Sequence, residues 1–176
     1  NGYDTWSLDN TRTTFSDQPG QDGQQIKAFT GAGNWLLGAT HALDASLSYL
    51  DANLHQSYDA DWVSDAFCVT YLCSSGNDTA SEIFDRNRDR VVADVRLLGG
   101  DDNTAAGSNQ YVLGLYSNTG SENFDYRHPS LWYGDVASNS NYDTTRYAVY
   151  GEYEYNLSEQ LTLTAGLRLE HFEDNY

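Results

Sequence analysis

With 176 residues, the chain is long enough to bury the core of one domain, so length alone does not force either a complete or a partial fold. A formal net charge of −17 argues against nucleic-acid binding, because this excess of carboxylates repels a phosphate backbone. The sequence has no run of about 18 apolar residues, which argues against a membrane-spanning helix. The 14 Tyr, four Trp and six Phe, with only two Pro, favour an ordered protein rich in β-strands.

Both ends of the sequence suggest a chain that has been cut from a longer one. Asn1 begins without the charged and apolar regions of a signal peptide, and Tyr176 closely follows a strongly alternating segment. We therefore expect residues 1–176 to be one partial segment of a larger β-structure, with no signal peptide in it.

The first half of the chain is predicted to form strands separated by polar connections. Residues 3–14 are expected to form a first strand, which a polar connection over 15–23 follows. A tight hairpin is predicted with its turn at 41–44 and a departing strand at 45–50. A longer polar connection is expected over 59–82.

The long connection carries the only two cysteines of the sequence, Cys68 and Cys73. Two cysteines are too few for a zinc site without other nearby ligands, and their spacing suits a small loop disulfide. The alternative is two unpaired thiols.

The same connection holds an acidic cluster made by Asp59, Asp61 and Asp65. A hard cation such as calcium would suit these oxygen ligands, but the Gly and the terminal Glu of an EF-hand loop are missing. We favour solvated loop carboxylates over a metal site.

The second half of the chain repeats the design. Strands are predicted at 90–98 and 110–116, and the Gly-, Asp- and Asn-rich segment 99–108 between them is typical of a turn. A longer polar connection over 128–141 follows.

The clearest element is residues 161–171. All odd positions from 161 to 169 are apolar, and the even positions between 162 and 170 are polar or Gly, which predicts a strand with one apolar face. A strand over 147–155 precedes it, and the polar residues 156–160 predict a hairpin turn.

Short and long connections alternate along the chain. This predicts an all-β, antiparallel up-and-down meander of about seven strands, because outer-membrane barrels have short turns on one rim and long loops on the other. The longer predicted strands, such as 147–155 and 161–171, also reach the 9–11 or so residues that cross a bilayer. Aromatic residues near strand ends suit interface girdles, although cross-strand pairing explains them equally: Tyr147, Tyr153, Tyr155, Phe172 and Tyr176.

Six segments in this order resemble successive barrel strands of TonB-dependent receptors. They are SDQPGQD (16–22), YDADW (58–62), RNRDR (86–90), DVRL (94–97), YVLGLY (111–116) and LTAGLR (163–168). The resemblance spans nearly the whole chain, and its last segment carries the most weight.

The resemblance implies a segment of a large transmembrane β-barrel in the bacterial outer membrane, typically of about 22 strands with a plugged lumen. It implies import of a small scarce nutrient, such as an iron chelate, cobalamin or a glycan. The plug domain, energy-coupling box and closing strand of the whole receptor are not recognised in the chain. The implied partners are the lipid bilayer, the nutrient and, through the absent plug, an inner-membrane energy-coupling protein. The oxidising periplasm that such a barrel passes through favours the Cys68–Cys73 disulfide.

No catalytic, cofactor-binding or metal-binding motif emerges from the sequence. The histidines share no ligand spacing, and segment 31–36 only begins like a nucleotide-binding Gly-x-Gly-x-x-Gly motif. We therefore expect neither enzymatic activity nor a cofactor. In a barrel, four charged residues would line the lumen: Glu152, Glu154, Arg168 and Glu170.

A second interpretation stays open from the sequence. A soluble β-barrel or β-sandwich would turn the same apolar faces inward to form a core. Such a module could bind a carbohydrate by stacking it on Trp35, Trp62 or Trp132. The discriminating observation is where the apolar faces lie.

Overall fold

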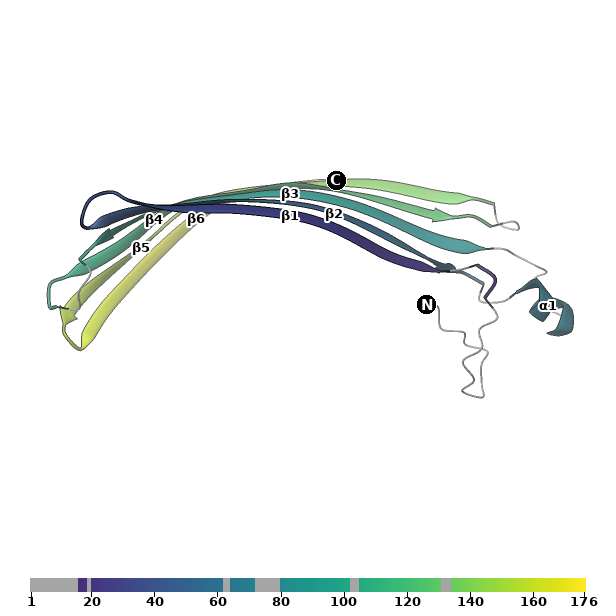
Figure 1. Cartoon of the computed structure of the whole chain (residues 1–176), viewed down its shortest axis with the longest axis horizontal. Coiled ribbons are helices and arrows are strands. Elements are labelled where there is room, and N and C mark those ends of the chain that lie inside the picture. Colours follow the sequence, from purple (N-terminus) through teal and green to yellow (C-terminus); the bar gives the residue numbers. More distant parts are fainter. Residues whose placement is uncertain (1–15, 19, 62–63, 72–79, 102–104, 131–133) are drawn as a thin grey trace. The chain divides into compact units, whose positions relative to one another are not determined.

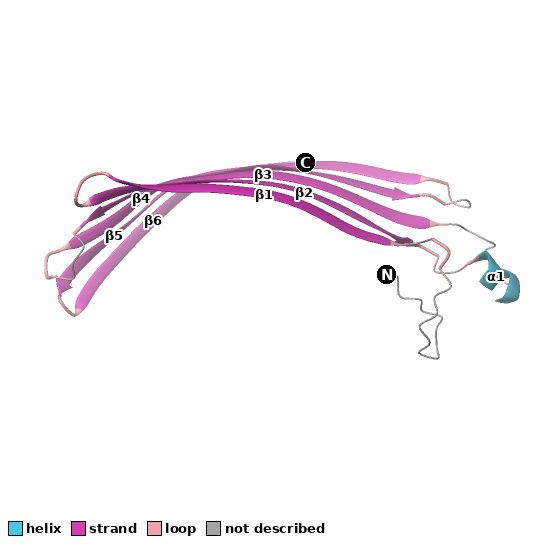
Figure 2. Cartoon of the chain, viewed as in Figure 1, coloured by secondary structure: helices cyan, strands magenta, loops and turns pink. Residues whose placement is uncertain are grey.

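The computed structural model describes residues 16–18, 20–61, 64–71, 80–101, 105–130 and 134–176. They form six strands and one helix (Figures 1 and 2): β1 (Gln21–Leu36), β2 (His41–Asp59), α1 (Asp65–Tyr71), β3 (Ser81–Gly100), β4 (Asn109–His128), β5 (Val136–Ser158) and β6 (Leu161–Asn175). Among the described helices, none is long and apolar enough to span a bilayer.

The six strands form one sheet in the order of the chain, β1-β2-β3-β4-β5-β6. The predicted all-β antiparallel meander is therefore confirmed, and β1 and β6 are its edge strands. The additional strand expected at residues 3–14 lies outside the described residues.

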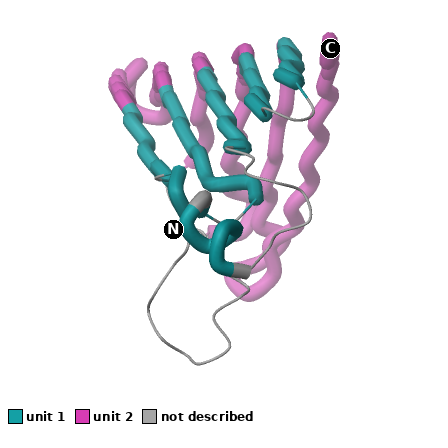
Figure 3. The backbone as a smooth tube through the Cα atoms, turned by 90° about the vertical axis from the view of Figure 1, so that its right-hand side faces the viewer, with its two compact units in different colours: residues 1–26, 52–88, 122–141 teal, residues 27–51, 89–121, 142–176 magenta. Residues whose placement is uncertain are grey.

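The chain divides into two compact units (Figure 3). Unit 1 consists of residues 1–26, 52–88 and 122–141, and unit 2 of residues 27–51, 89–121 and 142–176. Strands β1 to β5 contribute residues to both units, whereas β6 belongs wholly to unit 2. Each unit is described by itself below.

Unit 2 contains the short turns between β1 and β2, β3 and β4, and β5 and β6. The predicted turn at 41–44 is wrong, because these residues already belong to β2 and the reversal occurs at 37–40. Gly38 adopts a φ of 94°, which only glycine adopts readily, and the Leu37 amide donates to the His41 carbonyl across the turn. The composition of this region correctly predicted a turn, but the position of the turn depends on Gly38.

The β5–β6 hairpin confirms the strongest prediction from the sequence. Tyr147 pairs with His171, Val149 with Leu169, and Gly151 with Leu167. The turn is shorter than the predicted 156–160, because β5 continues to Ser158 through an irregularity between Asn156 and Ser158.

Unit 1 contains the longer connections, over residues 60–80 and 129–135. Both were predicted, but the second is shorter than expected because β5 begins at Val136. The first contains α1, which the sequence did not predict. The Phe67 amide donates to the Ser64 hydroxyl at 3.3 Å, so Ser64 caps the start of this helix.

The sheet buries few apolar side chains. Among the described residues, the buried hydrophobic ones are Cys68, Ala80 and Ala148, while many Leu, Val, Tyr and Trp side chains are exposed. A globular domain of this length hides most such side chains in a core. The exposed apolar residues therefore need another environment, and their distribution defines the candidate site.

Candidate functional site

Most exposed apolar side chains in the strands of unit 2 occupy odd-numbered positions, and Leu36 and Phe172 are the exceptions. Because successive residues of a strand point to opposite faces, the odd-numbered residues of any one strand share a face, and the face that carries these side chains is here called the apolar face. Residues of all six strands contribute to it, including Phe29, Trp35, Leu47, Tyr49, Val91, Val95, Leu113, Leu115, Tyr147, Val149, Tyr153, Tyr155, Leu163, Leu167 and Leu169.

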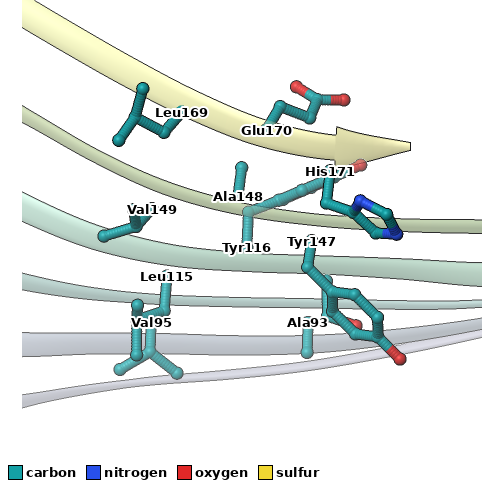
Figure 4. A pocket seen from close by; sticks show the side chains of 11 residues that line it. Ala93, Val95, Leu115, Tyr116, Tyr147, Ala148, Val149, Leu169, Glu170 and His171 are labelled. Carbon is teal, nitrogen blue, oxygen red and sulfur yellow. The ribbon is translucent and has the colours of Figure 1, made fainter.

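Contacts across the strands confirm this shared face. In β5 and β6, Val149 lies opposite Leu169, and both line one groove with Leu115 of β4 and Val95 of β3 (Figure 4). On the other side of the sheet, Asp44 of β2 lines a pocket with Arg96 of β3. Their odd-numbered neighbours must therefore lie together on the apolar face.

The apolar face has a polar limit at one end and tyrosines near both ends. On β5 it extends over nine residues from Tyr147 to Tyr155, within the range of about 9–11 residues that cross a hydrocarbon layer. Tyr147 stands near one end of this segment and Tyr155 at the other. Beyond the first end, the same face carries the Lys27–Asp51 pair at 3.7 Å.

The opposite face of unit 2, here called the polar face, carries linked charged and hydroxyl groups. The Tyr150 hydroxyl donates to Asp94 at 3.0 Å, and Arg96 donates to the same carboxylate at 2.5 Å. Arg168 donates to Glu170 at 2.8 Å, and its guanidinium lies 5.6 Å from the centre of the Tyr150 ring. The two predicted charged residues of β6 are thus brought into one network.

The predicted pair Glu152 and Glu154 lies on the same polar face. Glu152 is opposite Gly166 and Glu154 opposite Thr164, whose hydroxyl donates to the Glu154 carboxylate at 3.3 Å. Strict alternation along β5 predicted this placement correctly.

Unit 1 brings four aromatic side chains together in an aromatic patch, defined as Tyr58, Phe84, Phe124 and Tyr126. The ring centre of Phe84 lies 6.1 Å from those of Tyr58 and Phe124, and 5.1 Å from that of Tyr126. These residues come from β2, β3 and β4, so their proximity depends on strand register. Sequence reasoning missed the patch because no local spacing connects its members.

Ion pairs flank the aromatic patch. Glu122 lies 3.1 Å from Arg86 and 2.5 Å from Arg88, and the Arg86 guanidinium stands 5.3 Å from the centre of the Phe124 ring. The Tyr58 hydroxyl donates to Glu82, and this hydrogen bond, with burial, raises the pKa of Tyr58 to about 12. The patch therefore combines aromatic surface with charges that are compensated by neighbouring side chains.

A second charged group of unit 1 is centred on Asp85. His55 Nδ1 lies 2.6 Å from one carboxylate oxygen, and Arg127 donates to the other at 2.8 Å. The hydrogen bond with His55, followed by the one from Arg127, lowers the pKa of Asp85 despite its partial burial.

The acidic cluster differs from the one that the sequence suggested. Asp59 and Asp61 lie close to Asp17, with one carboxylate oxygen of each within 4.8 Å of the others, whereas the side chain of Asp65 lies outside the described part. Asp59 is buried and accepts hydrogen bonds from the backbone amides of Asp17 and Asp61. Loop hydrogen bonding explains the cluster, and the preference for solvated carboxylates over a calcium site stays a prediction.

Two of the aromatic residues expected at interface girdles lie elsewhere. Tyr147, Tyr153 and Tyr155 are on the apolar face, but Phe172 pairs with Arg146 on the polar face, with the guanidinium 4.4 Å from its ring centre. Tyr176 follows β6, and its ring centre lies 5.0 Å from that of Tyr142. Phe172 and Tyr176 have even numbers, whereas the apolar face carries odd positions. The alternation along β6 therefore argues against placing them on that face.

The remaining predicted residues are only partly described. Cys68 is buried in α1, but Cys73 lies outside the described residues, so their disulfide stays a prediction. Trp62 and Trp132 also lie outside them, and Trp35 belongs to the exposed apolar face.

Comparisons with known proteins identify the family. No curated protein and no solved structure matches the chain. The family model described as TonB dependent receptor-like, beta-barrel matches residues 1–176, the full extent of the sequence. The chain therefore belongs to the TonB-dependent receptor-like β-barrel family, a family of outer-membrane receptors.

Proposed function

We propose that the chain is a wall segment of an outer-membrane active-transport receptor, with its apolar face in lipid and its polar face toward the lumen. The observation that carries this proposal is the exposed apolar face of unit 2, which lies on the same strands as an ion-paired polar face. Burial of one Leu or Val side chain contributes about 1.5–3 kcal/mol, so a face of this extent favours an apolar environment. A bilayer supplies that environment, and a closed barrel satisfies the strand backbones within it.

The connections support an orientation in the membrane. Short turns lie on the periplasmic rim of outer-membrane barrels and longer loops on the outer rim. We therefore assign the turn at 159–160 to the periplasmic side, and the connections 60–80 and 129–135 to the outside. Unit 1, with its charged strand segments, then belongs to the water-exposed part of the receptor.

The aromatic patch is our candidate for contact with the transported nutrient, which would be an iron chelate, cobalamin or a glycan. Aromatic rings offer extensive apolar contact area, and the neighbouring Arg86 and Glu122 can orient a polar ligand. Transport would require an inner-membrane energy-coupling protein, acting through a plug domain. The proposed role is binding and import, with no chemical step.

A soluble binding module is the alternative function. It would have to cover the apolar face with a second layer of its own. Among the residues that the structure describes, no such layer is present, and the only helix is one of seven residues. The exposed apolar face therefore favours the receptor.

The orientation is tested by inserting an epitope tag after Ser130 or after Glu159 and treating intact cells with antibody. We expect the first tag to bind antibody on intact cells, and the second only after the outer membrane has been permeabilised. Recovery of the tagged protein in the soluble fraction, or exposure of both tags on intact cells, would contradict the proposal.

The transport role is tested separately by deleting the gene and limiting iron, cobalamin or glycans in turn. We expect slower growth under one limitation, with recovery when the wild-type gene is restored. Substitution of Phe84 by Ala should leave the protein in the membrane but weaken the recovery. Normal growth of the deletion strain under every limitation would argue against nutrient import.

A further inference from the structure

An apolar groove of about 670 Å³ lies on the apolar face of unit 2 and crosses β3, β4, β5 and β6 (Figure 4). Ala93 and Ser117 have small side chains, which leave space in the groove. Four branched side chains form its aliphatic part: Val95, Leu115, Val149 and Leu169. The groove thus offers contacts to an apolar occupant from several strands at once.

The polar residues of the groove lie toward one end. Tyr147 and His171, which pair across β5 and β6, line that end, and Tyr116, Ser117 and Glu170 also contribute to the lining. The next pair on the same face is Thr145 with Glu173. Toward the other end, the face continues through Gly151 and Leu167, so it stays apolar.

We propose that this groove binds one acyl chain of a bilayer lipid, with the lipid headgroup beside Tyr147 and His171. The proposal rests on the proposed function, because it requires the apolar face to be in a membrane. The polarity of a lipid decreases in the same way as that of the groove, from the headgroup through the ester region to the hydrocarbon chain. The Tyr147 hydroxyl and the His171 ring can hydrogen-bond to ester or phosphate oxygens at that end.

A second copy of the chain fits the groove less well than a lipid does. Interfaces between proteins usually have an apolar centre enclosed by a polar rim. Here the rim is absent on the side of Leu167, where the apolar face continues. Lipid can cover that continuous surface while one chain lies in the groove.

The test uses the receptor in vesicles of phosphatidylethanolamine and phosphatidylglycerol, with a trace of phosphatidylcholine that is spin-labelled near its ester end. The measured quantity is the number of motionally restricted lipids for each protein molecule. Ala93→Phe and, separately, Ser117→Phe fill the groove with a ring. Gly31→Phe is the matched control, since Gly31 lies on the apolar face of β1 outside the groove and faces nothing closer than the Phe29 ring at 3.6 Å.

We expect each groove variant to lose about one restricted lipid per protein, and Gly31→Phe to retain the wild-type number. Unchanged numbers in both groove variants would overturn the groove proposal, as would an equal loss in the control. A dimer that forms in the wild type and disappears in both groove variants would assign the groove to a second copy instead. Failure of the wild type to insert into vesicles would contradict the proposed function itself, which separates the two failures.

Discussion

At the scale of single residues, the polar face depends on a glycine beneath a tyrosine. Tyr150 of β5 reaches across β4 to Asp94 of β3, and the strand it crosses carries Gly114 at that point. A Cβ atom at Gly114 would overlap the Tyr150 ring. The hydrogen bond between β5 and β3 therefore requires the absence of a side chain on β4.

We predict that Gly114→Ala displaces the Tyr150 ring and destabilises the folded protein by about 1–3 kcal/mol, as overpacking commonly does. Urea unfolding, followed by the change in electrophoretic mobility between folded and heated protein, measures the difference. Gly31→Ala is the control, because its Cβ would stand 3.6 Å from the nearest atom, an ordinary contact. Equal stability of Gly114→Ala and the wild type would show that Tyr150 does not need this space.

Asp85 in unit 1 makes stability depend on pH. Its pKa is lowered by His55 and Arg127 from the ordinary 3.8, so the folded state binds the carboxyl proton more weakly than the unfolded state. The stabilisation is fully present above pH 3.8 and is lost as the pH falls through the lower folded pKa.

We predict that Asp85→Asn lowers the free energy of unfolding at neutral pH, and that the difference from the wild type shrinks below pH 3.8. Urea unfolding at a series of pH values measures both. His55→Gln removes the largest cause of the shift, so its acid transition should lie closer to pH 3.8 than that of the wild type. If the difference in unfolding free energy between Asp85→Asn and the wild type stayed constant into strong acid, the Asp85 carboxyl would not be the cause of the pH dependence.

Cys68 and Cys73 are proposed to form a disulfide in the connection that includes α1. We predict that neither thiol reacts with iodoacetamide in the protein isolated from the outer membrane, and that both react after reduction. Mass spectrometry of the peptides distinguishes the two states, and Cys68→Ser should free Cys73 for alkylation. Alkylation of both cysteines without reduction would rule the disulfide out.

At the scale of strands, alternation predicted the faces well and the turns less well. The period of two in β6 and β5 correctly separated Leu167 and Leu169 from Arg168 and Glu170. The first turn was misplaced by a few residues, because a positive φ at Gly38, and not the polar His41, determines where the chain reverses. Alternation is a property of each strand, whereas a turn depends on one backbone conformation.

We predict that Leu167→Arg destabilises the membrane-inserted protein by about 2–4 kcal/mol, since a charge on the lipid face near the bilayer midplane must leave water. Thr164→Arg is the control on the polar face of the same strand. Urea unfolding from phospholipid vesicles should show a clear loss for the first variant and a much smaller one for the second. Similar losses in both would argue against lipid on the apolar face.

At the scale of the whole molecule, the sequence predicted the meander, the alternation of short and long connections, and the family. It did not predict the aromatic patch, because Tyr58, Phe84 and Phe124 meet only through the register of three strands. It also missed Asp17 beside Asp59, a neighbour from a distant part of the chain. Contacts of this kind depend on how strands pair, which a local pattern does not determine.

The most direct test of the account is spin labelling along β5 in the membrane-inserted receptor. After replacing both native cysteines by Ser, single cysteines are labelled at each position from 147 to 155, and collisions with oxygen and with a water-soluble nickel complex are measured. We predict that odd positions collide mainly with oxygen, which concentrates in lipid, and that even positions collide mainly with nickel. Loss of this alternation, or the same oxygen exposure on both faces, would contradict a strand with one face in lipid and the other in a polar lumen.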